Sequence, residues 1–139
     1  MRDTEVRLTS IYVAPTGSLA SSPSPNSEDA PAKNFDLFIR GEEGDEIQGN
    51  DIKYTLSYYA MDFGTGNLAP GAFNGMLNQS TGGADWLPYN GGEDYFTNQK
   101  IPITVPGGLT GHVLQYFAVL VAVRGDIVSF VQSEPFVLV

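Results

Sequence analysis

The side chains of this sequence that could perform chemistry are mostly carboxylates, and they gather in a few short segments. The densest segment contains Glu42, Glu43, Asp45, Glu46 and Asp51. Several carboxylates on one flexible loop are ligands that calcium prefers, but the alternate-position spacing of calcium-binding loops is missing here. A pair of carboxylates could also hydrolyse a glycosidic bond by acid/base catalysis. Nothing in the sequence fixes the distance between two carboxyl groups that this hydrolysis requires. We therefore interpret the segment as a solvated turn and expect no metal site.

Catalysis by an imidazole or a thiol has little support in the sequence. The chain contains one histidine, His112, and no cysteine. His112 falls in a turn region, residues 107–112, where we expect an imidazole at the surface rather than a general base. The sequence also lacks the Gly-x-Ser-x-Gly elbow, the His-Glu-x-x-His motif and a phosphate-binding glycine-rich loop before a helix. We expect no enzymatic activity, no catalytic residue and no cofactor.

Aromatic side chains offer a second kind of chemistry. Trp86, Tyr89, Tyr95 and Phe96 lie among Asn and Asp residues. Aromatic faces stack on pyranose rings and amides bind hydroxyl groups, so residues 86–96 are a candidate carbohydrate-binding loop. The interpretation that we favour is simpler, namely that Trp86 pins the loop to the core.

The charge of the chain limits its partners. Its 139 residues carry 16 Asp and Glu against 7 Lys and Arg, a formal net charge of −9. This charge repels nucleic-acid phosphates and anionic membranes, so we expect neither as a partner. The longest apolar run is too short to cross a bilayer, and the N-terminus lacks the apolar segment of a secretory signal. We expect a soluble protein whose location the sequence does not reveal.

Short strands must position these side chains. The 16 Gly and 9 Pro separate short apolar clusters, which is typical of an all-β protein. Alternation at period two predicts strands over residues 4–13, 35–40 and 52–61, and a slip in the first of them predicts a bulge near Ser10. Pro102 cannot donate to a ladder, which suggests an edge position for its strand. The same reasoning predicts four further strands, over residues 101–105, 115–123, 127–131 and 136–139.

Two segments interrupt the strands. Residues 14–33 are rich in Pro, Ser and Gly and are expected to form a tether. Residues 63–99 are long for a loop without structure, so they are either functional or hide a short strand. The expected organisation is an N-terminal strand at 1–13, the tether at 14–33 and one sandwich domain at 34–139.

Three of the predicted strands resemble those of one known family. Residues 54–58, residues 116–123 preceded by Leu109, and residues 133–139 are similar to the third, sixth and last strands of fibronectin type III and related immunoglobulin-like domains. In that family a Tyr of the sixth strand forms a corner, and Tyr116 is its counterpart here. The resemblance implies an immunoglobulin-like two-sheet antiparallel sandwich of about seven strands with a long middle loop, and a role in binding without chemistry.

The tripeptide Arg124-Gly125-Asp126 suggests the hypothesis of binding to an adhesion receptor, because one fibronectin type III module carries the same residues in the loop between its last two strands. Gly-Asp at a tight hairpin is also ordinary turn chemistry. We favour the turn.

The strand over residues 116–123 has no polar face. One side carries Tyr, Ala, Leu and Ala, and the other carries Phe, Val, Val and Val. A single core covers one of these sides, so we expect the other to be covered by the N-terminal strand, by residues 63–99 or by another subunit. The expected interface residues are Val6, Leu8, Ile11, Phe117, Val119, Val121 and Val123.

The leading hypothesis is a structural or interaction protein without enzymatic activity. It would associate with itself as a homo-oligomer, or dock on a larger assembly such as a filament or virion, through the apolar sheet face and the tethered N-terminal strand. One alternative is a carbohydrate-binding module that uses residues 86–96. The other is a small hydrolase with carboxylate catalysis.

Overall fold

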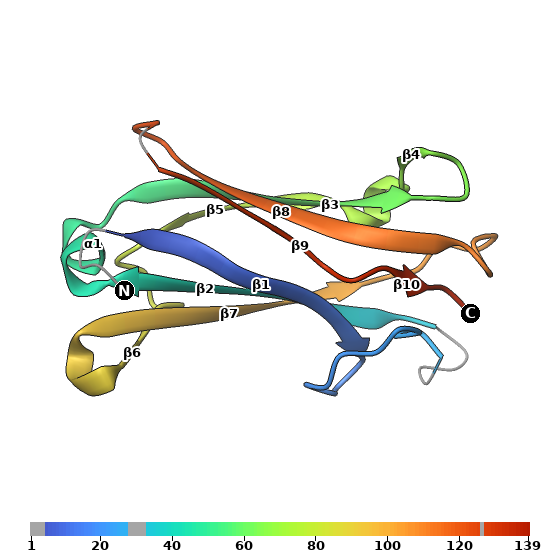
Figure 1. The fold of residues 1–139 in the computed structure, drawn as a ribbon, viewed down its shortest axis with the longest axis horizontal. Coiled ribbons are helices and arrows are strands. Elements are labelled where there is room, and N and C mark those ends of the chain that lie inside the picture. The colour runs from blue at the N-terminus through green and yellow to red at the C-terminus, as the bar shows by residue number, and fades with distance from the viewer. Residues whose placement is uncertain (1–4, 28–32, 126) are drawn as a thin grey trace.

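The computed structural model of the chain describes residues 5–27, 33–125 and 127–139. They form two antiparallel β-sheets that pack face to face, as Figure 1 shows. The predicted all-β two-sheet sandwich is therefore confirmed. Of the ten strands in the described residues, β4, β6 and β10 are only two or three residues long. Each of the seven predicted strands has a counterpart, with β10 as the one at 136–139, while β4, β5 and β6 were not predicted.

The first sheet has the strand order β1-β2-β7-β6. The bulge expected near Ser10 is confirmed, because the pairing of β1 with β2 shifts register between Leu8 and Ser10. The N-terminal strand belongs to the sandwich itself, and Val6, Leu8 and Ile11 are buried in its core. The strands of this sheet are β1 (Val6–Pro15), β2 (Phe35–Gly44), β7 (Asp94–Ile103) and β6 (Leu87–Tyr89).

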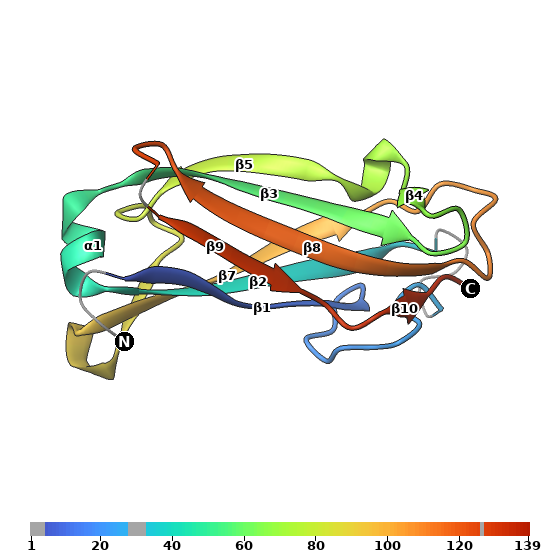
Figure 2. The same cartoon turned by 45° about the horizontal axis from the view of Figure 1, so that its top comes forward.

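The second sheet is built around β3 and β8, which pair along residues 54–62 and 114–122. β4 and β5 pair with the other edge of β3, and β9 and β10 pair with the other edge of β8. Figure 2 shows β9 and β10 in line along that outer edge, next to β1. The strands are β3 (Lys53–Asp62), β4 (Asn67–Leu68), β5 (Gly75–Ser80), β8 (Val113–Ala122), β9 (Val128–Gln132) and β10 (Phe136–Val137).

Aromatic rings fill the core between the sheets. The ring centroids of Phe73, Tyr116 and Phe136 lie 6.3, 6.5 and 5.6 Å from that of Phe35. The Tyr116 hydroxyl donates to the carbonyl oxygen of Phe73 at 2.8 Å, in the 3-10 helix η1 (Gly71–Phe73). The tyrosine corner implied by the family resemblance is therefore wrong, because this bond reaches 43 residues back along the chain instead of the turn just before β8. Tyr116 instead anchors η1 to the core.

Residues 63–99 are structured over most of their length. They contain β4, η1, β5, β6 and the 3-10 helix η2 (Asn90–Gly92), and the strand predicted at 101–105 begins earlier, at Asp94. The sequence hides this part of β7 because its inward positions carry polar side chains. Gln99 Nε2 donates to Thr97 Oγ1 at 2.8 Å, so these two groups satisfy each other without an apolar alternation.

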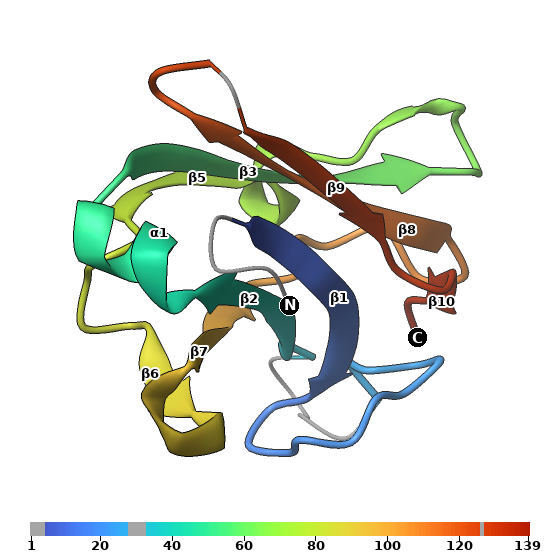
Figure 3. The ribbon, with the colours of Figure 1, turned by 60° about the vertical axis from the view of Figure 1, so that its left-hand side comes forward.

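A short helix, α1 (Asp45–Asn50), occupies the predicted turn between β2 and β3. Figure 3 places it at one end of the sandwich, beside the two layers. Ile47 is its one buried residue, which is too little to produce a helical period in the sequence. The buried Thr81 hydroxyl donates to the Ile47 carbonyl and accepts from the Ile52 amide, so it ties α1 to β3. No helix among the described residues is long and apolar enough to cross a membrane.

The described part of the predicted tether lies against the sandwich. The Ser22 amide donates to the Val13 carbonyl at 3.0 Å, and the Val137 amide donates to the Pro23 carbonyl at 2.8 Å. The Asn26 side chain exchanges two hydrogen bonds of 3.0 Å with the backbone of Val139. Residues 16–27 thus connect β1 to the last strand. The prediction for residues 28–32 lies outside the described residues.

Candidate functional site

The outward side chains of the second sheet form an apolar surface. Phe130 is 53% exposed, and Val121 and Val128 are also exposed. Because side chains alternate along a strand, these residues point away from the core that the inward side chains of β8 fill. We name this surface the outer apolar face and define it by Tyr59, Phe117, Val119, Val121, Val128 and Phe130.

Cross-strand pairs hold the outer apolar face in place. The ring of Phe117 stacks on Tyr59 of β3, with centroids 5.4 Å apart and planes 15° apart. On its other side Phe117 contacts Phe130, at 6.0 Å between centroids. Val121 lies directly opposite Val128. Since neighbouring strands fix these positions, the surface is already formed before any partner binds.

The face is free of negative charge. The outward positions of β3, β8 and β9, all of them described, contain Lys53 as their one charged residue. The chain as a whole carries a formal charge of −9. The carboxylates are therefore distributed over other parts of the molecule.

Within the described residues, neither of the two internal covers expected from the sequence lies over this face. β1 pairs with β2 in the first sheet, and β5 extends the second sheet sideways from β3. Beside β5 the surface continues into a groove of about 590 Å³, where Leu68 and Met76 are exposed. The possibility of another subunit stays a prediction.

The expected interface residues separate into two groups. Phe117, Val119 and Val121 lie on the outer apolar face, and Val123 is exposed in the turn that follows β8. The other three belong to the core of their own chain, because the inward side of β1 packs between the sheets, and these are Val6, Leu8 and Ile11. The sequence did not single out Phe130 and Val128, although alternation in residues 127–131 puts both on one side.

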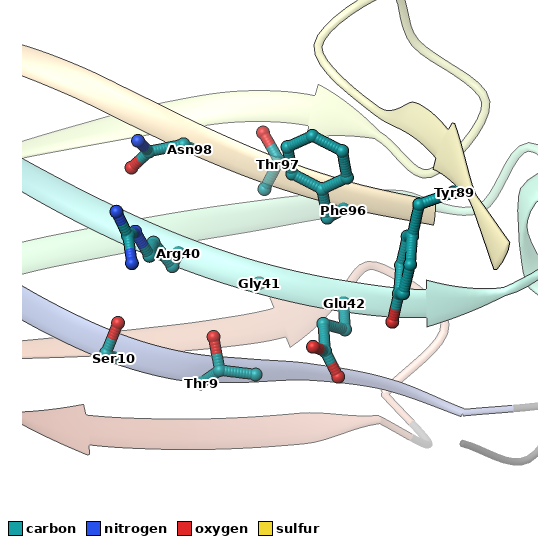
Figure 4. Close-up of a pocket in the computed structure, with 9 residues that line it drawn as sticks. All are labelled: Thr9, Ser10, Arg40, Gly41, Glu42, Tyr89, Phe96, Thr97 and Asn98. Carbon is teal, nitrogen blue, oxygen red and sulfur yellow. The ribbon is translucent and has the colours of Figure 1, made fainter. Parts of the chain in front are cut away.

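A second concave site lies on the outer face of the first sheet. It is a hollow of about 460 Å³ between β1, β2, β7 and β6, and Figure 4 shows the side chains around it. Phe96 and Tyr89 meet edge to face with centroids 5.7 Å apart. Arg40 and Glu42 come from β2. We name it the first-sheet hollow.

Charged groups around the first-sheet hollow are held by neighbours on the same face. Arg40 Nη2 donates to the Tyr12 hydroxyl at 3.2 Å, and its guanidinium lies 5.1 Å from the centre of the Tyr12 ring. Glu42 lies 3.6 Å from the Arg7 guanidinium. Burial raises the pKa of Tyr89, and the nearby charge of Glu42 raises it further.

The four aromatic residues of the candidate carbohydrate-binding loop do not form one platform. Trp86 is 4% exposed, and its indole N–H donates to the Tyr54 hydroxyl at 3.1 Å. Tyr95 points inward and packs against the core. Trp86 thus pins the loop to the core and presents no face to a ligand, whereas Tyr89 and Phe96 line the first-sheet hollow.

The acidic segment also separates on folding. Glu42 and Glu43 are neighbours in β2 and point to opposite sides of the sheet, while Asp45 and Glu46 lie in the first turn of α1. Glu43 is completely buried, neither of its carboxylate oxygens has a hydrogen-bond partner, and burial raises its pKa to about 8. The alternation of Phe35, Leu37 and Ile39, continued along β2, is the signal that puts position 43 inside. No group of three or more His, Cys, Asp and Glu converges in the part of the chain that is described.

His112 forms a hydrogen bond with Asp62. Its Nδ1 lies 2.8 Å from Asp62 Oδ2, and the Gly64 amide donates to Asp62 Oδ1 at 2.8 Å. Burial alone would raise the pKa of Asp62, but the hydrogen bonds from His112, Gly64 and Thr65 lower it overall. The pair ties the turn after β3 to the turn before β8.

The Arg124-Gly125-Asp126 tripeptide lies between β8 and β9, which form the expected hairpin. Gly125 has a φ of 82°, a left-handed conformation that favours glycine, and its amide donates to the Ala122 carbonyl. Asp126 lies outside the described residues. Gly125 therefore serves the turn, and the hypothesis of binding to an adhesion receptor stays untested.

No protein family model matches this chain, and no curated protein is similar to it in sequence. Its class is therefore defined by its own fold, an all-β antiparallel sandwich. The two surfaces that distinguish it are the outer apolar face and the first-sheet hollow.

Proposed function

We propose that this protein is a structural or interaction protein without enzymatic activity that associates with a second copy of itself through the outer apolar face. The observation that carries the proposal is the exposure of Phe130, Val121 and Val128 on a rigid sheet. Contiguous apolar surface of this kind is uncommon on a monomer and is typical of an interaction site. Each Val or Phe that becomes fully buried contributes roughly 1.5–3 kcal/mol.

The size of the face suits a dimer. The ten residues of β3 and of β8 extend about 33 Å at roughly 3.3 Å per residue, whereas β5 and β9 extend about 20 and 17 Å, and each strand is about 4.8 Å wide. Two such faces would bury roughly 1,000 Å² in total, the lower limit for a specific complex. Two sheets that pack face to face about a two-fold axis satisfy both copies with the same residues.

The charge distribution on this face permits a second copy as the occupant. Each copy brings a formal charge of −9, which opposes association at long range. Because the outward positions of β3, β8 and β9 contain no carboxylate, contact through this face brings no acidic groups together. An unrelated neighbour in a filament or virion is the other possible occupant, and the experiment below separates the two.

We also infer that the sandwich is immunoglobulin-like. The order β1-β2-β7-β6 corresponds to strands A-B-E-D of that fold, and β9-β8-β3-β5 corresponds to G-F-C-C′. This correspondence supports a binding role by analogy with the fold.

The test is the solution mass of the protein measured by light scattering over a concentration series. The chain is expected to reach twice its 15.0 kDa, and Phe130→Asp is expected to remain a monomer, because the new carboxylates would face each other without water. Phe96→Asp, on the other sheet, is the matched control and should still dimerise. A wild-type chain that stays monomeric at millimolar concentration would exclude a second copy and leave a different neighbour as the occupant.

Removing the N-terminal strand would not be a usable test. Val6, Leu8 and Ile11 belong to the core, so their loss is expected to unfold the domain instead of separating two copies.

A further inference from the structure

The first-sheet hollow lies between two rows of outward side chains. One row crosses the sheet through Ser10, Arg40 and Asn98, which are paired across β1, β2 and β7. The next row contains Glu42 and Phe96. Outward residues on one strand are about 6.6 Å apart, so the hollow extends over two successive outward positions of each strand. Its volume of about 460 Å³ falls within the usual range of small-ligand sites.

The hollow exists because of two local features. The bulge in β1 inserts Thr9 as an extra residue without a partner in β2, which bends the strand and increases its twist at this point. On the inner side, a Cβ at Gly41 would lie 3.2 Å from Trp86 Cη2, so the core-facing indole supports the strand backbone there. The floor is therefore rigid backbone, braced from below by the tryptophan.

One wall offers an apolar ring at a fixed angle. Phe96 is 38% exposed, and the edge-to-face contact with Tyr89 at 5.7 Å orients it. An exposed ring of this kind stacks on the C–H face of a pyranose. The same pair of rings contributes no charge to the site.

The other groups supply hydrogen bonds of both kinds. Asn98 is exposed and offers a donor and an acceptor, and Arg40 uses one of its five N–H groups on Tyr12. Glu42 offers acceptors next to the aromatic wall, as Figure 4 shows. A ring that carries several hydroxyl groups can donate to Glu42 and accept from Arg40 and Asn98 at once.

We propose that the first-sheet hollow binds a neutral saccharide. Arg40 and Glu42 are the charged residues among those that line the hollow, and their charges are opposite, so the lining itself has no net charge. A phosphate or sulfate would meet Glu42 and the overall charge of −9, and a cation would meet Arg40. A neutral polyol is the ligand class that satisfies both groups without a charge of its own.

This site is separate from the surface proposed for self-association. Figure 3 shows the two sheets as separate layers, so their outer faces point away from each other. Saccharide binding and dimer formation therefore succeed or fail independently.

The test is a titration of ¹⁵N-labelled protein with gluco-, galacto-, manno- and xylo-configured tetrasaccharides, followed by two-dimensional NMR. At least one of them is expected to shift the amide signals of Gly41, Phe96 and Asn98. Phe96→Ala and Asn98→Ala should each weaken that binding by about tenfold. Phe130→Ala removes an exposed ring from the other sheet and should leave the affinity unchanged.

Two results would overturn the proposal. One is the absence of shifts around Gly41 with all four sugars at about 10 mM, a concentration that half-fills a site with a Kd of about 10 mM. The other is equal or tighter binding of a sialylated or sulfated glycan, which would contradict the argument from charge. Well-dispersed spectra of both variants would confirm that any loss of binding is not a loss of fold.

Discussion

The two outer faces of the sandwich carry different side chains, although each belongs to an antiparallel sheet that covers the same core. The first sheet presents Arg7, Arg40, Glu42 and Lys100 among its outward residues. The second presents aromatic and branched apolar residues, with Lys53 as the one charge at the described outward positions of β3, β8 and β9. A face that meets only water gains nothing from such residues, so the difference supports the proposal that the second face has a partner.

The two outer faces also differ in how far their phenylalanine rings are exposed to solvent. Phe38 points outward from the first sheet, yet it is only 2% exposed. Tyr12 stacks on it at 5.0 Å, and Arg40 in turn lies over Tyr12. Phe130 on the second sheet has no such cover and is 53% exposed. The first face thus covers Phe38 with a tyrosine and a charged side chain of its own and leaves Phe96 exposed only at the first-sheet hollow, whereas the second face leaves Phe130 uncovered.

The largest expected effect comes from removing one ring on each face. Phe38→Ala should lower the free energy of unfolding by about 2–4 kcal/mol, because it removes a buried ring and its stacking contact with Tyr12. Phe130→Ala should cost less than about 1 kcal/mol in the monomer, since half of that ring is already in water. Urea denaturation at micromolar concentration, where the monomer dominates, measures both. Equal losses for the two variants would mean that the faces do not differ as described.

The next prediction concerns two adjacent glutamates that face opposite sides of the first sheet. Glu43 is buried with a pKa raised from 4.5 to about 8, while Glu42 lies at the surface. Between pH 4.5 and about pH 8 the carboxyl of Glu43 has lost its proton in the unfolded chain but keeps it in the folded chain. The free energy of unfolding therefore falls as the pH rises through this range. Glu43→Gln cannot ionise and should be more stable than the wild type at pH 8, on the order of 2 kcal/mol.

The measurement is urea denaturation at pH 5 and at pH 8. The stability gained by Glu43→Gln should be small at the lower pH and large at the higher one. Glu42→Gln is the matched control and should show no gain that grows with pH. A wild-type chain whose stability is the same at both pH values would contradict the assignment of a buried, unpaired carboxyl.

Much of the fold could be predicted from the sequence, because alternation marks β2, β3 and β8 and the slip at Ser10 marks the bulge. The strands that the sequence hides are those whose inward positions are polar, as at Thr97 and Gln99, or that are only a few residues long. Such strands form because their neighbours pair with them, and pairing between distant segments leaves no local pattern.

The candidate sites were harder to predict, for the same reason. The apolar side of β8 was visible, but its extension through Phe130 needs the register between β8 and β9. That Trp86 pins its loop to the core was predicted, but the partner of its indole N–H, Tyr54, lies 32 residues away in the chain and was not. The first-sheet hollow brings together Ser10, Arg40 and Asn98 from three strands, so no local sequence motif predicts it.

The smallest expected effect is on the salt dependence of self-association. Two copies that each carry a formal charge of −9 repel each other, and the outward positions of β3, β8 and β9 add no carboxylate to the contact. Salt screens this long-range repulsion without weakening apolar contact, so raising sodium chloride from about 50 to 500 mM should tighten dimerisation by a few-fold. Analytical ultracentrifugation at both concentrations measures the change. Dissociation at the higher salt would show that charge pairs hold the copies together, and would move the interface away from the outer apolar face.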